Sequence, residues 1–145
     1  MSLSDRNKHI MRNILYCIIA LLALTTACKE EQLTPEEAAL KSAKETVTEG
    51  YNSLIAGRYD SFIDCKAGGD TLPSEYREQL AVAYKQFMAQ QQEDHSGITS
   101  FEVSNMLIDS VADQIHVFLI LRFGDNTKEE IIVPMVECNG KWKMK

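Results

Sequence analysis

The spacing of apolar residues along this chain changes at Gly97. Before that glycine, apolar residues recur every three or four positions, which is the period of an amphipathic helix. After it, apolar and polar residues alternate, which is the period of a strand. Strands that follow one another through short turns pair in antiparallel fashion. The change therefore predicts an α+β fold, with N-terminal helices packed on a four-stranded antiparallel sheet.

Two long helices and a short one are expected in the first part of the folded region. Thr34-Pro35-Glu36-Glu37 offers a Thr cap, Pro at the first helical position and Glu three residues after the cap. The first helix should end at Gly57, a short helix should cover 59–65, and a third should run over about 73–93. Residues 66–70 are expected to form a flexible loop. The apolar stripes of the two long helices are Leu40, Ala43, Val47, Tyr51, Leu54 and Ile55, and Tyr76, Leu80, Ala83, Tyr84, Phe87 and Met88.

Four strands follow, and turn signals separate them. Asn139-Gly140 is a strong two-residue hairpin signal. Pro134 cannot donate to a ladder, so it predicts a free edge or a bulge in its strand. The expected strands are 98–108, 114–123, 128–138 and 141–145.

The two faces of strand 114–123 differ in character. One is wholly apolar and must pack on the helices: Ile115, Val117, Leu119, Leu121 and Phe123. The other is mixed, and its residues are Gln114, His116, Phe118, Ile120 and Arg122. We expect a ligand or partner to meet the mixed face, at His116, Phe118 and Arg122.

Size and charge limit the classes of function. The chain has 145 residues and a net charge of −6, and its basic residues are scattered. Length allows one domain of ordinary size. Nucleic-acid binding needs a cationic patch, so it is not expected.

The N-terminus has the parts of an export signal. Arg6, Lys8 and Arg12 precede an uncharged apolar run at 14–24, which is shorter than the roughly 20 residues that span a bilayer. Met11 could serve as the start in place of Met1. The string Leu24-Thr25-Thr26-Ala27-Cys28 then resembles the lipobox of bacterial lipoproteins. This resemblance implies a signal peptide over 1–27, a lipidated Cys28 that holds the protein to the membrane, a tether over 28–33 and a folded domain over 34–145.

Lys29-Glu30-Glu31 adds a second indication of location. A lysine and two acids after the lipidated cysteine resemble the signal that one Gram-negative phylum uses for lipoproteins on its outer surface. The resemblance implies an outer-membrane lipoprotein exposed at the surface, and the periplasmic face of that membrane is the alternative.

The four cysteines leave open whether the folded domain contains a disulfide bond. Cys17 lies in the signal and Cys28 at its end, so Cys65 and Cys138 are left to the domain. An envelope compartment permits a disulfide between them, provided that their Cα atoms lie within about 7 Å. The pair could equally be two free thiols.

The order of elements resembles the nuclear-transport-factor-two-like (cystatin-like) fold, and more narrowly small bacterial lipoproteins with that fold and no known function. The residues behind the resemblance are Tyr59-Asp60-Ser61-Phe62, strand 114–123 and Asn139-Gly140-Lys141-Trp142-Lys143. It implies a cone in which a curved sheet wraps a helix and leaves a pocket. Loop 66–72 stands where many such domains have a hairpin, so the cone is expected to be shallow. The resemblance also allows a homodimer through the sheet face.

Catalytic signals are sparse. His116 could act as a general base in a pocket with Asp113, Tyr51 or Tyr84, or it could be a half-exposed histidine at a sheet edge. Arg122 could hold an anion or pair with a strand neighbour such as Glu130. His95 and His116 have no ligand-type spacing to a cysteine or acid, and no cofactor motif occurs. No metal and no cofactor are expected.

Three functions remain open. The first is a membrane-anchored module that binds an envelope protein or a small ligand. The second is a small enzyme that uses His116 and an acid in a cone pocket. The third is an accessory or immunity-like envelope protein without a ligand pocket. Fold alone does not choose among them.

Overall fold

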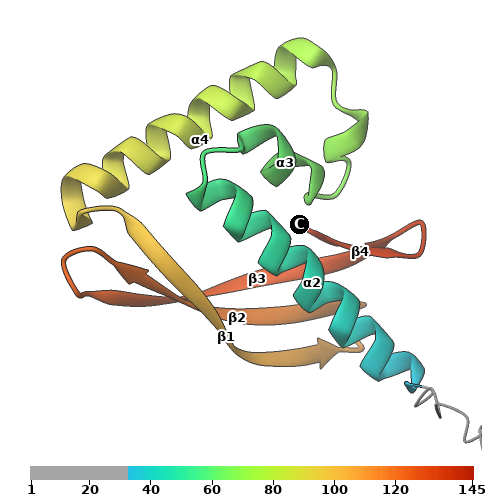
Figure 1. The fold of residues 1–145 in the computed structure, drawn as a ribbon. Helices are drawn as coiled ribbons and strands as arrows, with labels where there is room; N and C mark the ends of the chain where they lie inside the picture. The colour runs from blue at the N-terminus through green and yellow to red at the C-terminus, as the bar shows by residue number, and fades with distance from the viewer. Residues whose placement is uncertain (1–32) are drawn as a thin grey trace, which may run out of the picture. The chain divides into compact units, whose positions relative to one another are not determined.

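Every helix precedes every strand in residues 33–145, the part of the chain that the computed structural model describes. Figure 1 shows the helices gathered on one side of the sheet. The expected α+β class is confirmed. The elements are α2 (Pro35–Ile55), α3 (Tyr59–Asp64), the 3₁₀ turn η2 (Gly69–Thr71), α4 (Ser74–His95), β1 (Ile98–Asp109), β2 (Gln114–Phe123), β3 (Lys128–Cys138) and β4 (Lys141–Met144).

Helix α2 begins with the expected capping box. The backbone N–H of Glu37 donates to Oγ1 of Thr34 at 3.2 Å, and the backbone N–H of Thr34 donates to Oε2 of Glu37 at 2.8 Å. These two bonds satisfy N–H groups that the first helical turn leaves without intrahelical partners. The helix ends before Gly57, whose φ of 74° is in the left-handed region that glycine tolerates.

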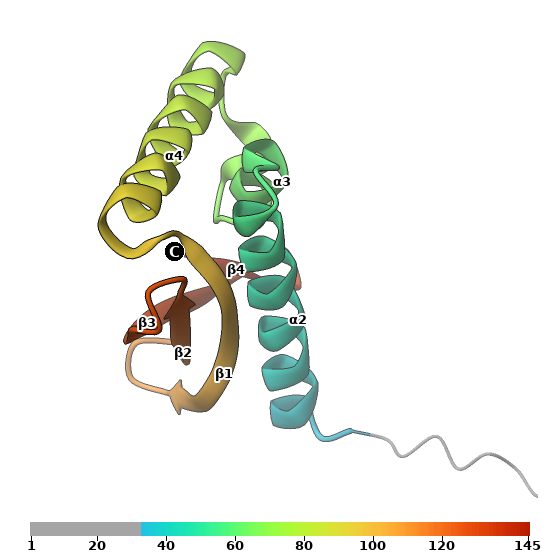
Figure 2. The same cartoon turned by 60° about the vertical axis from the view of Figure 1, so that its left-hand side comes forward.

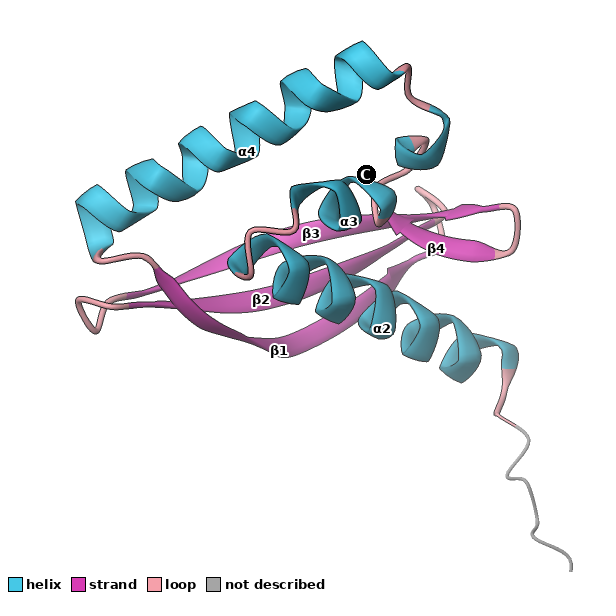
Figure 3. Cartoon of the chain, turned by 45° about the horizontal axis from the view of Figure 1, so that its top comes forward, coloured by secondary structure: helices cyan, strands magenta, loops and turns pink. Residues whose placement is uncertain are grey.

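The sheet is antiparallel, with strand order β1-β2-β3-β4. Figure 3 shows it beneath α2 and α3. The apolar face of β2 is turned toward the helices as predicted: Ile115, Val117 and Leu119 are at most 1% exposed, and Leu121 and Phe123 are 5% and 6% exposed. This face will be called the inner face of the sheet, and the opposite one the outer face.

Pro134 stands at a free edge of β3, in line with one of the two expectations. Strand β4 pairs with β3 only from Met135 to Cys138, and beyond that point the oxygen of Pro134 accepts a bond from the N–H of Lys145 at 2.9 Å. In an antiparallel strand the N and O of one residue point to the same side. The nitrogen of Pro134 therefore faces Lys145, the residue after β4, and cannot donate to it.

The segment after α3 is tied to the last strand. The N–H of Met144 donates to the oxygen of Cys65 at 2.9 Å, and the N–H of Ala67 donates to the oxygen of Met144 at 2.7 Å. Residues 69–71 add the turn η2. The segment 66–70, expected as an irregular loop, is instead a connection whose backbone bonds to β4 and to itself.

Two hydrophobic clusters hold these elements together. The larger joins α2 and α3 to the inner face through residues such as Val47, Leu54 and Leu119, and the smaller contains Ile98, Leu121 and Phe123. Both lie within Leu33–Lys145, which forms a unit of its own. We therefore expect residues 33–145 to fold without the segment that precedes them.

Candidate functional site

Helix α4 differs from the other long helix in its packing. None of its 22 residues is fully buried, although it carries the apolar stripe expected from the sequence. Phe87, in the middle of that stripe, is 44% exposed. Figure 2 shows α4 standing beside α2 and α3 and meeting β1 at its C-terminal end. The helix therefore contacts the core only through partly buried residues such as Tyr84 and Met88.

The N-terminal end of α4 is fixed by Arg77. Its guanidinium bonds to the Asp60 side chain at 2.9 Å and to Asp64 at 2.8 Å, and also to the backbone oxygens of Asp60 at 2.7 Å and Gly69 at 3.0 Å. One side chain thus connects α4 to α3 and η2. The planar guanidinium suits this task because it presents five N–H donors in a rigid arrangement.

The C-terminal end of α4 is fixed at the hairpin between β2 and β3. Nδ1 of His95 lies 3.1 Å from Oδ2 of Asp125, and its ring lies 4.9 Å from that of Phe123. The N–H of Asp125 donates to the oxygen of His95 at 3.0 Å. Bonds from Thr127 and then from His95 hold the pKa of Asp125 below its ordinary value. With both ends fixed and only partly buried contacts between them, such as that of Tyr84 with Phe62, α4 forms an arch.

A cavity of about 520 Å³ lies beneath this arch. Its volume is in the range of roughly 300–1,000 Å³ typical of small-molecule sites. The walls are mostly apolar and come from every layer of the domain. They are formed by Tyr51 and Leu54 of α2, Phe62 of α3, Ala83, Tyr84, Phe87 and Gln91 of α4, and Ile98, Leu121, Phe123 and Ile131 of the sheet, with Lys66 and Glu129 as the charged members.

An aromatic cluster forms one wall of the cavity. The Phe62 ring meets Tyr84 edge-on at a centroid distance of 4.8 Å and Tyr51 at 5.9 Å. The Nζ atom of Lys66 lies 5.8 Å from the centroid of the same ring. These contacts bring α2, α3, α4 and the segment before η2 together at one place.

The polar groups of this wall have shifted pKa values. Burial, with a smaller contribution from Tyr84, raises the pKa of Tyr51 to about 12. Burial also raises the pKa of Tyr84 and lowers that of Lys66. The tyrosines are thus neutral hydroxyl donors over the whole physiological range, and Lys66 is a partly desolvated cation.

His116, Phe118 and Arg122 do not line this cavity. They alternate with the buried residues of β2, so they stand on the outer face. His116 pairs with Leu107 and Pro134 across the sheet. His116 is half-exposed, as one of its two alternatives expected, but it lies on β2 between β1 and β3 and not at a sheet edge, and it cannot serve as a base within this cavity. The sequence predicted that the inner face packs on the helices. At its Leu121–Phe123 end, however, a cavity lies between this face and α4.

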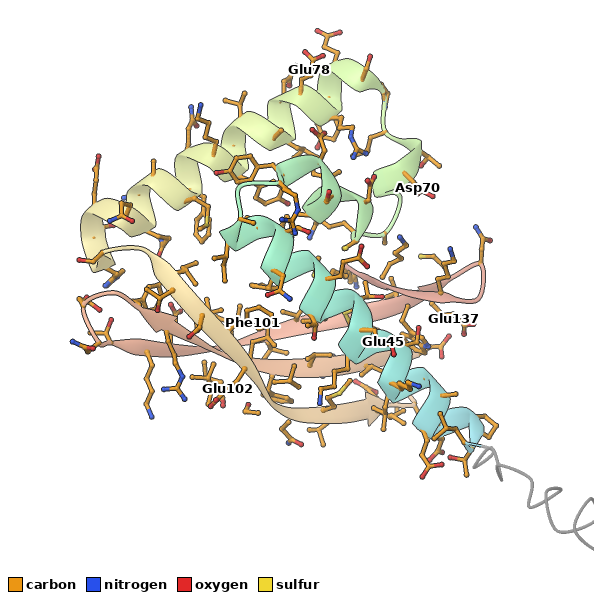
Figure 4. The ribbon with its side chains drawn as sticks, in the orientation of Figure 1. Glu45, Asp70, Glu78, Phe101, Glu102 and Glu137 are labelled. Carbon is orange, nitrogen blue, oxygen red and sulfur yellow. The ribbon has the colours of Figure 1, made fainter. Side chains whose placement is uncertain are left out.

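Arg122 pairs with a strand neighbour, although not with Glu130. Its Nη2 lies 3.0 Å from Oε1 of Glu102 on β1. Figure 4 shows Glu102 on the side of the sheet away from α2. Glu130 instead lies 3.4 Å from Oγ of Ser104.

The outer face carries an apolar patch of its own. Ile132 is 57% exposed and Leu107 51%, and Phe118 and Ile120 lie half-buried between them. No element among residues 33–145 covers this face. Leu107, Phe118, Ile120 and Ile132 will be called the outer patch.

Cys65 and Cys138 are both free thiols in the structure. Cys65 is buried beside Met144, and Cys138 pairs with Lys141 at the other end of β4. Burial, with a smaller contribution from Glu49, raises the pKa of Cys65. Cys28 and the segments 1–27 and 28–32 lie outside the described residues.

Between residues 33 and 145, no three His, Cys, Asp or Glu side chains come together as metal ligands would. Within the same range, no helix combines the length and the apolar character needed to cross a bilayer.

Sequence reasoning missed the cavity-lining residues as a group. Tyr51, Leu54 and Tyr84 read as core because they fall on helical stripes, and Leu121 reads as core because it lies on an apolar strand face. The aromatic residues of the third helix that line the cavity, Tyr84 and Phe87, were the signal that could have indicated it. Stripe spacing says which face points inward but not how closely that face approaches the sheet.

The fold now defined is that of an NTF2-like domain, with helices first and then a four-stranded antiparallel sheet. A matching solved structure, described as an NTF2-like transpeptidase from Campylobacter jejuni, aligns with a TM-score of 0.53 at 12% sequence identity, over 70% of this chain and 95% of that one. The expected resemblance in fold is thereby confirmed. No protein-family model matches the sequence, and no curated protein matches it.

Proposed function

We propose that this protein is a ligand-binding module of the cell envelope, held to the membrane by a lipidated Cys28. The observation that supports the binding role is the apolar cavity of about 520 Å³ beneath α4. The space is lined by apolar side chains such as Leu121 and Phe123, which make fewer contacts there than in a closely packed core. An apolar ligand would restore them.

Two variants of α4 test this role. Ala83 lines the cavity, and its neighbour Val82 is 54% exposed and does not line it. We expect Ala83→Trp to fill the cavity and Val82→Trp to leave it open. The measurement is the fluorescence gain of the neutral dye N-phenyl-1-naphthylamine with residues 33–145. Loss of the gain in Ala83→Trp alone supports the proposal, whereas equal gains in all three proteins would refute it.

The anchor is a separate part of the proposal. Its support is the sequence around Cys28, with a short apolar run and small residues before the cysteine. Cys28→Ala should abolish incorporation of labelled palmitate and release the protein from the membrane fraction. Protease treatment of whole cells then distinguishes surface display, in which the domain is digested, from the periplasmic face, where it survives.

The outer patch favours a second candidate, association with an envelope protein or with a second copy of this chain. Ile132 and Leu107 are each more than half exposed on a sheet face that no described element covers. Ile132→Glu should then lower the sedimentation coefficient at high concentration, whereas Val111→Glu, at an exposed turn residue, should not. A monomer at every concentration, with or without the substitution, would argue against self-association.

A further inference from the structure

Charge is distributed unevenly around the cavity. Lys66 is the basic side chain among the lining residues, and Glu129 is the acidic one. The Nζ of Lys66 donates to the main-chain oxygen of Lys145, the last residue of the sequence, at 3.1 Å, and no side-chain carboxylate among residues 33–145 pairs with it. An ammonium group has three N–H donors, so two remain for another acceptor.

Two tyrosines, Tyr51 and Tyr84, line the same cavity as Lys66. Phe62 contacts the rings of both Tyr51 and Tyr84 and also lies beneath Lys66, so all three polar residues border one ring. No buried polar side-chain atom among the described residues lacks a partner, and both tyrosines line the cavity. Their hydroxyls are therefore open to whatever occupies it, and each can donate one hydrogen bond.

Glu129 lies at the end of the cavity opposite Lys66. The N–H of Lys145 bonds to Pro134, which places the Lys66 ammonium near that point of β3. Glu129 precedes Pro134 by five residues, or about 16 Å along a strand. Between the two ends the wall is formed by Leu121, Phe123 and Ile131. The cavity thus has a donor end, an apolar middle and an acidic end.

We propose that the cavity takes an amphipathic monoanion, with a carboxylate at Lys66, Tyr51 and Tyr84 and an apolar body over Leu121 and Phe123. This inference rests on the proposed binding role of the cavity. A carboxylate satisfies the free donors of Lys66 with charge-assisted bonds, which are stronger than neutral ones. It would be repelled from the Glu129 end, so one orientation is favoured.

Three probes of equal chain length test the ligand class: decanoate, decanol and decylammonium, each below its micelle-forming concentration. Calorimetric titration into residues 33–145 should give the highest affinity for decanoate and the lowest for decylammonium. Lys66→Gln should weaken decanoate binding about 10- to 100-fold, the loss expected for a hydrogen bond to a charged group. Binding of decanol should not change. Lys66→Arg should restore most of the decanoate affinity, and Lys85→Gln, on the exposed side of α4, should resemble the unchanged protein.

The outcomes separate the two proposals. Equal affinity for the three probes, or decanoate binding that survives Lys66→Gln, would overturn the anionic ligand class while leaving a binding cavity. Failure of all three probes to bind would overturn the ligand class and the binding role together. Thermal melting of each variant checks that a lost affinity is not a lost fold.

Discussion

Lys66 is the residue on which the ligand assignment depends most. Burial lowers its pKa, and no side-chain carboxylate among residues 33–145 pairs with its ammonium group. Tyr51, Tyr84 and Glu129 are the other titratable groups that line the same space. A ligand carboxylate would stabilise the ammonium form and raise the pKa of Lys66 toward or above its ordinary value. Binding and protonation of Lys66 are therefore linked.

Affinity for decanoate should consequently depend on pH above neutrality. Because the pKa of free Lys66 lies below 10.5, binding should weaken as pH rises through that lowered value and on to the higher pKa of the complex. Tyr51, with a pKa of about 12, stays a neutral donor over most of this window. Calorimetry across the alkaline range should show the decline for decanoate, no matching decline for decanol, and a flat profile in Lys66→Gln. A flat profile in the unchanged protein would contradict the role of Lys66.

The capping box of α2 supplies a second prediction for single residues. Bonds from the backbone and side chain of Thr34 lower the pKa of Glu37. A carboxyl with a lowered folded pKa stabilises the fold above its unfolded pKa, and this contribution is lost as pH falls through the folded value. Thr34→Ala should therefore lower the urea midpoint at pH 7, with a smaller difference at pH 3. An equal difference at both pH values would mean that Glu37 plays no part.

At the scale of elements, the sequence predicted the bounds of the helices and strands and which strand faces are buried. It did not predict how closely α4 approaches the sheet. Alternation along 114–123 predicted which side chains of β2 would be buried, and Asn139-Gly140 predicted the last hairpin. The position of α4 depends on the contacts of Arg77 with Asp60 and Asp64. These contacts join residues that are far apart in the sequence. The same limit explains Arg122: register determines whether Glu102 or Glu130 is within reach, and register is a property of the paired strands.

Neighbouring residues of β2 should differ sharply in their contribution to stability. Leu119 is fully buried on the inner face, and Ile120 is half-buried on the outer face. Leu119→Ala should lower the free energy of unfolding by about 2–5 kcal/mol, the usual range for a buried large-to-small change. Ile120→Ala should cost clearly less. Chemical denaturation measures both, and equal losses would mean that the outer face is covered in solution.

Loss of the Arg77 contacts should loosen α4 more than the rest of the domain. Arg77→Ala removes the bonds to α3 and η2 while leaving the His95 end in place. Amide hydrogen exchange should then accelerate in the N-terminal half of α4 and remain unchanged in β2. Arg58→Ala, which removes a single 3.4 Å bond to Ser53, is the matched control. Uniform acceleration throughout the domain would show that α4 is part of the global unfolding unit.

At the scale of the whole molecule, the proposed anchor and the cavity constrain each other. If Cys28 is lipidated, the six residues to the cap at Thr34 span at most about 20 Å. The domain would then sit close to the bilayer, where amphipathic molecules with one charged end concentrate. A cavity that binds amphipathic anions would be consistent with a domain held close to the bilayer. The outer patch, on the opposite face of the sheet, would stay accessible to a protein partner.

Methyl resonances of adjacent residues test the central claim, a ligand site beneath α4, most directly. Ile131 lines the cavity, and Ile132 stands 57% exposed on the outer face, so the two report on opposite sides of one strand. Titration of decanoate into methyl-labelled 33–145 should shift Ile131 and Leu121 and leave Ile132 and Ile120 in place. Shifts confined to Ile132 and Ile120, or no shifts at all, would contradict the account.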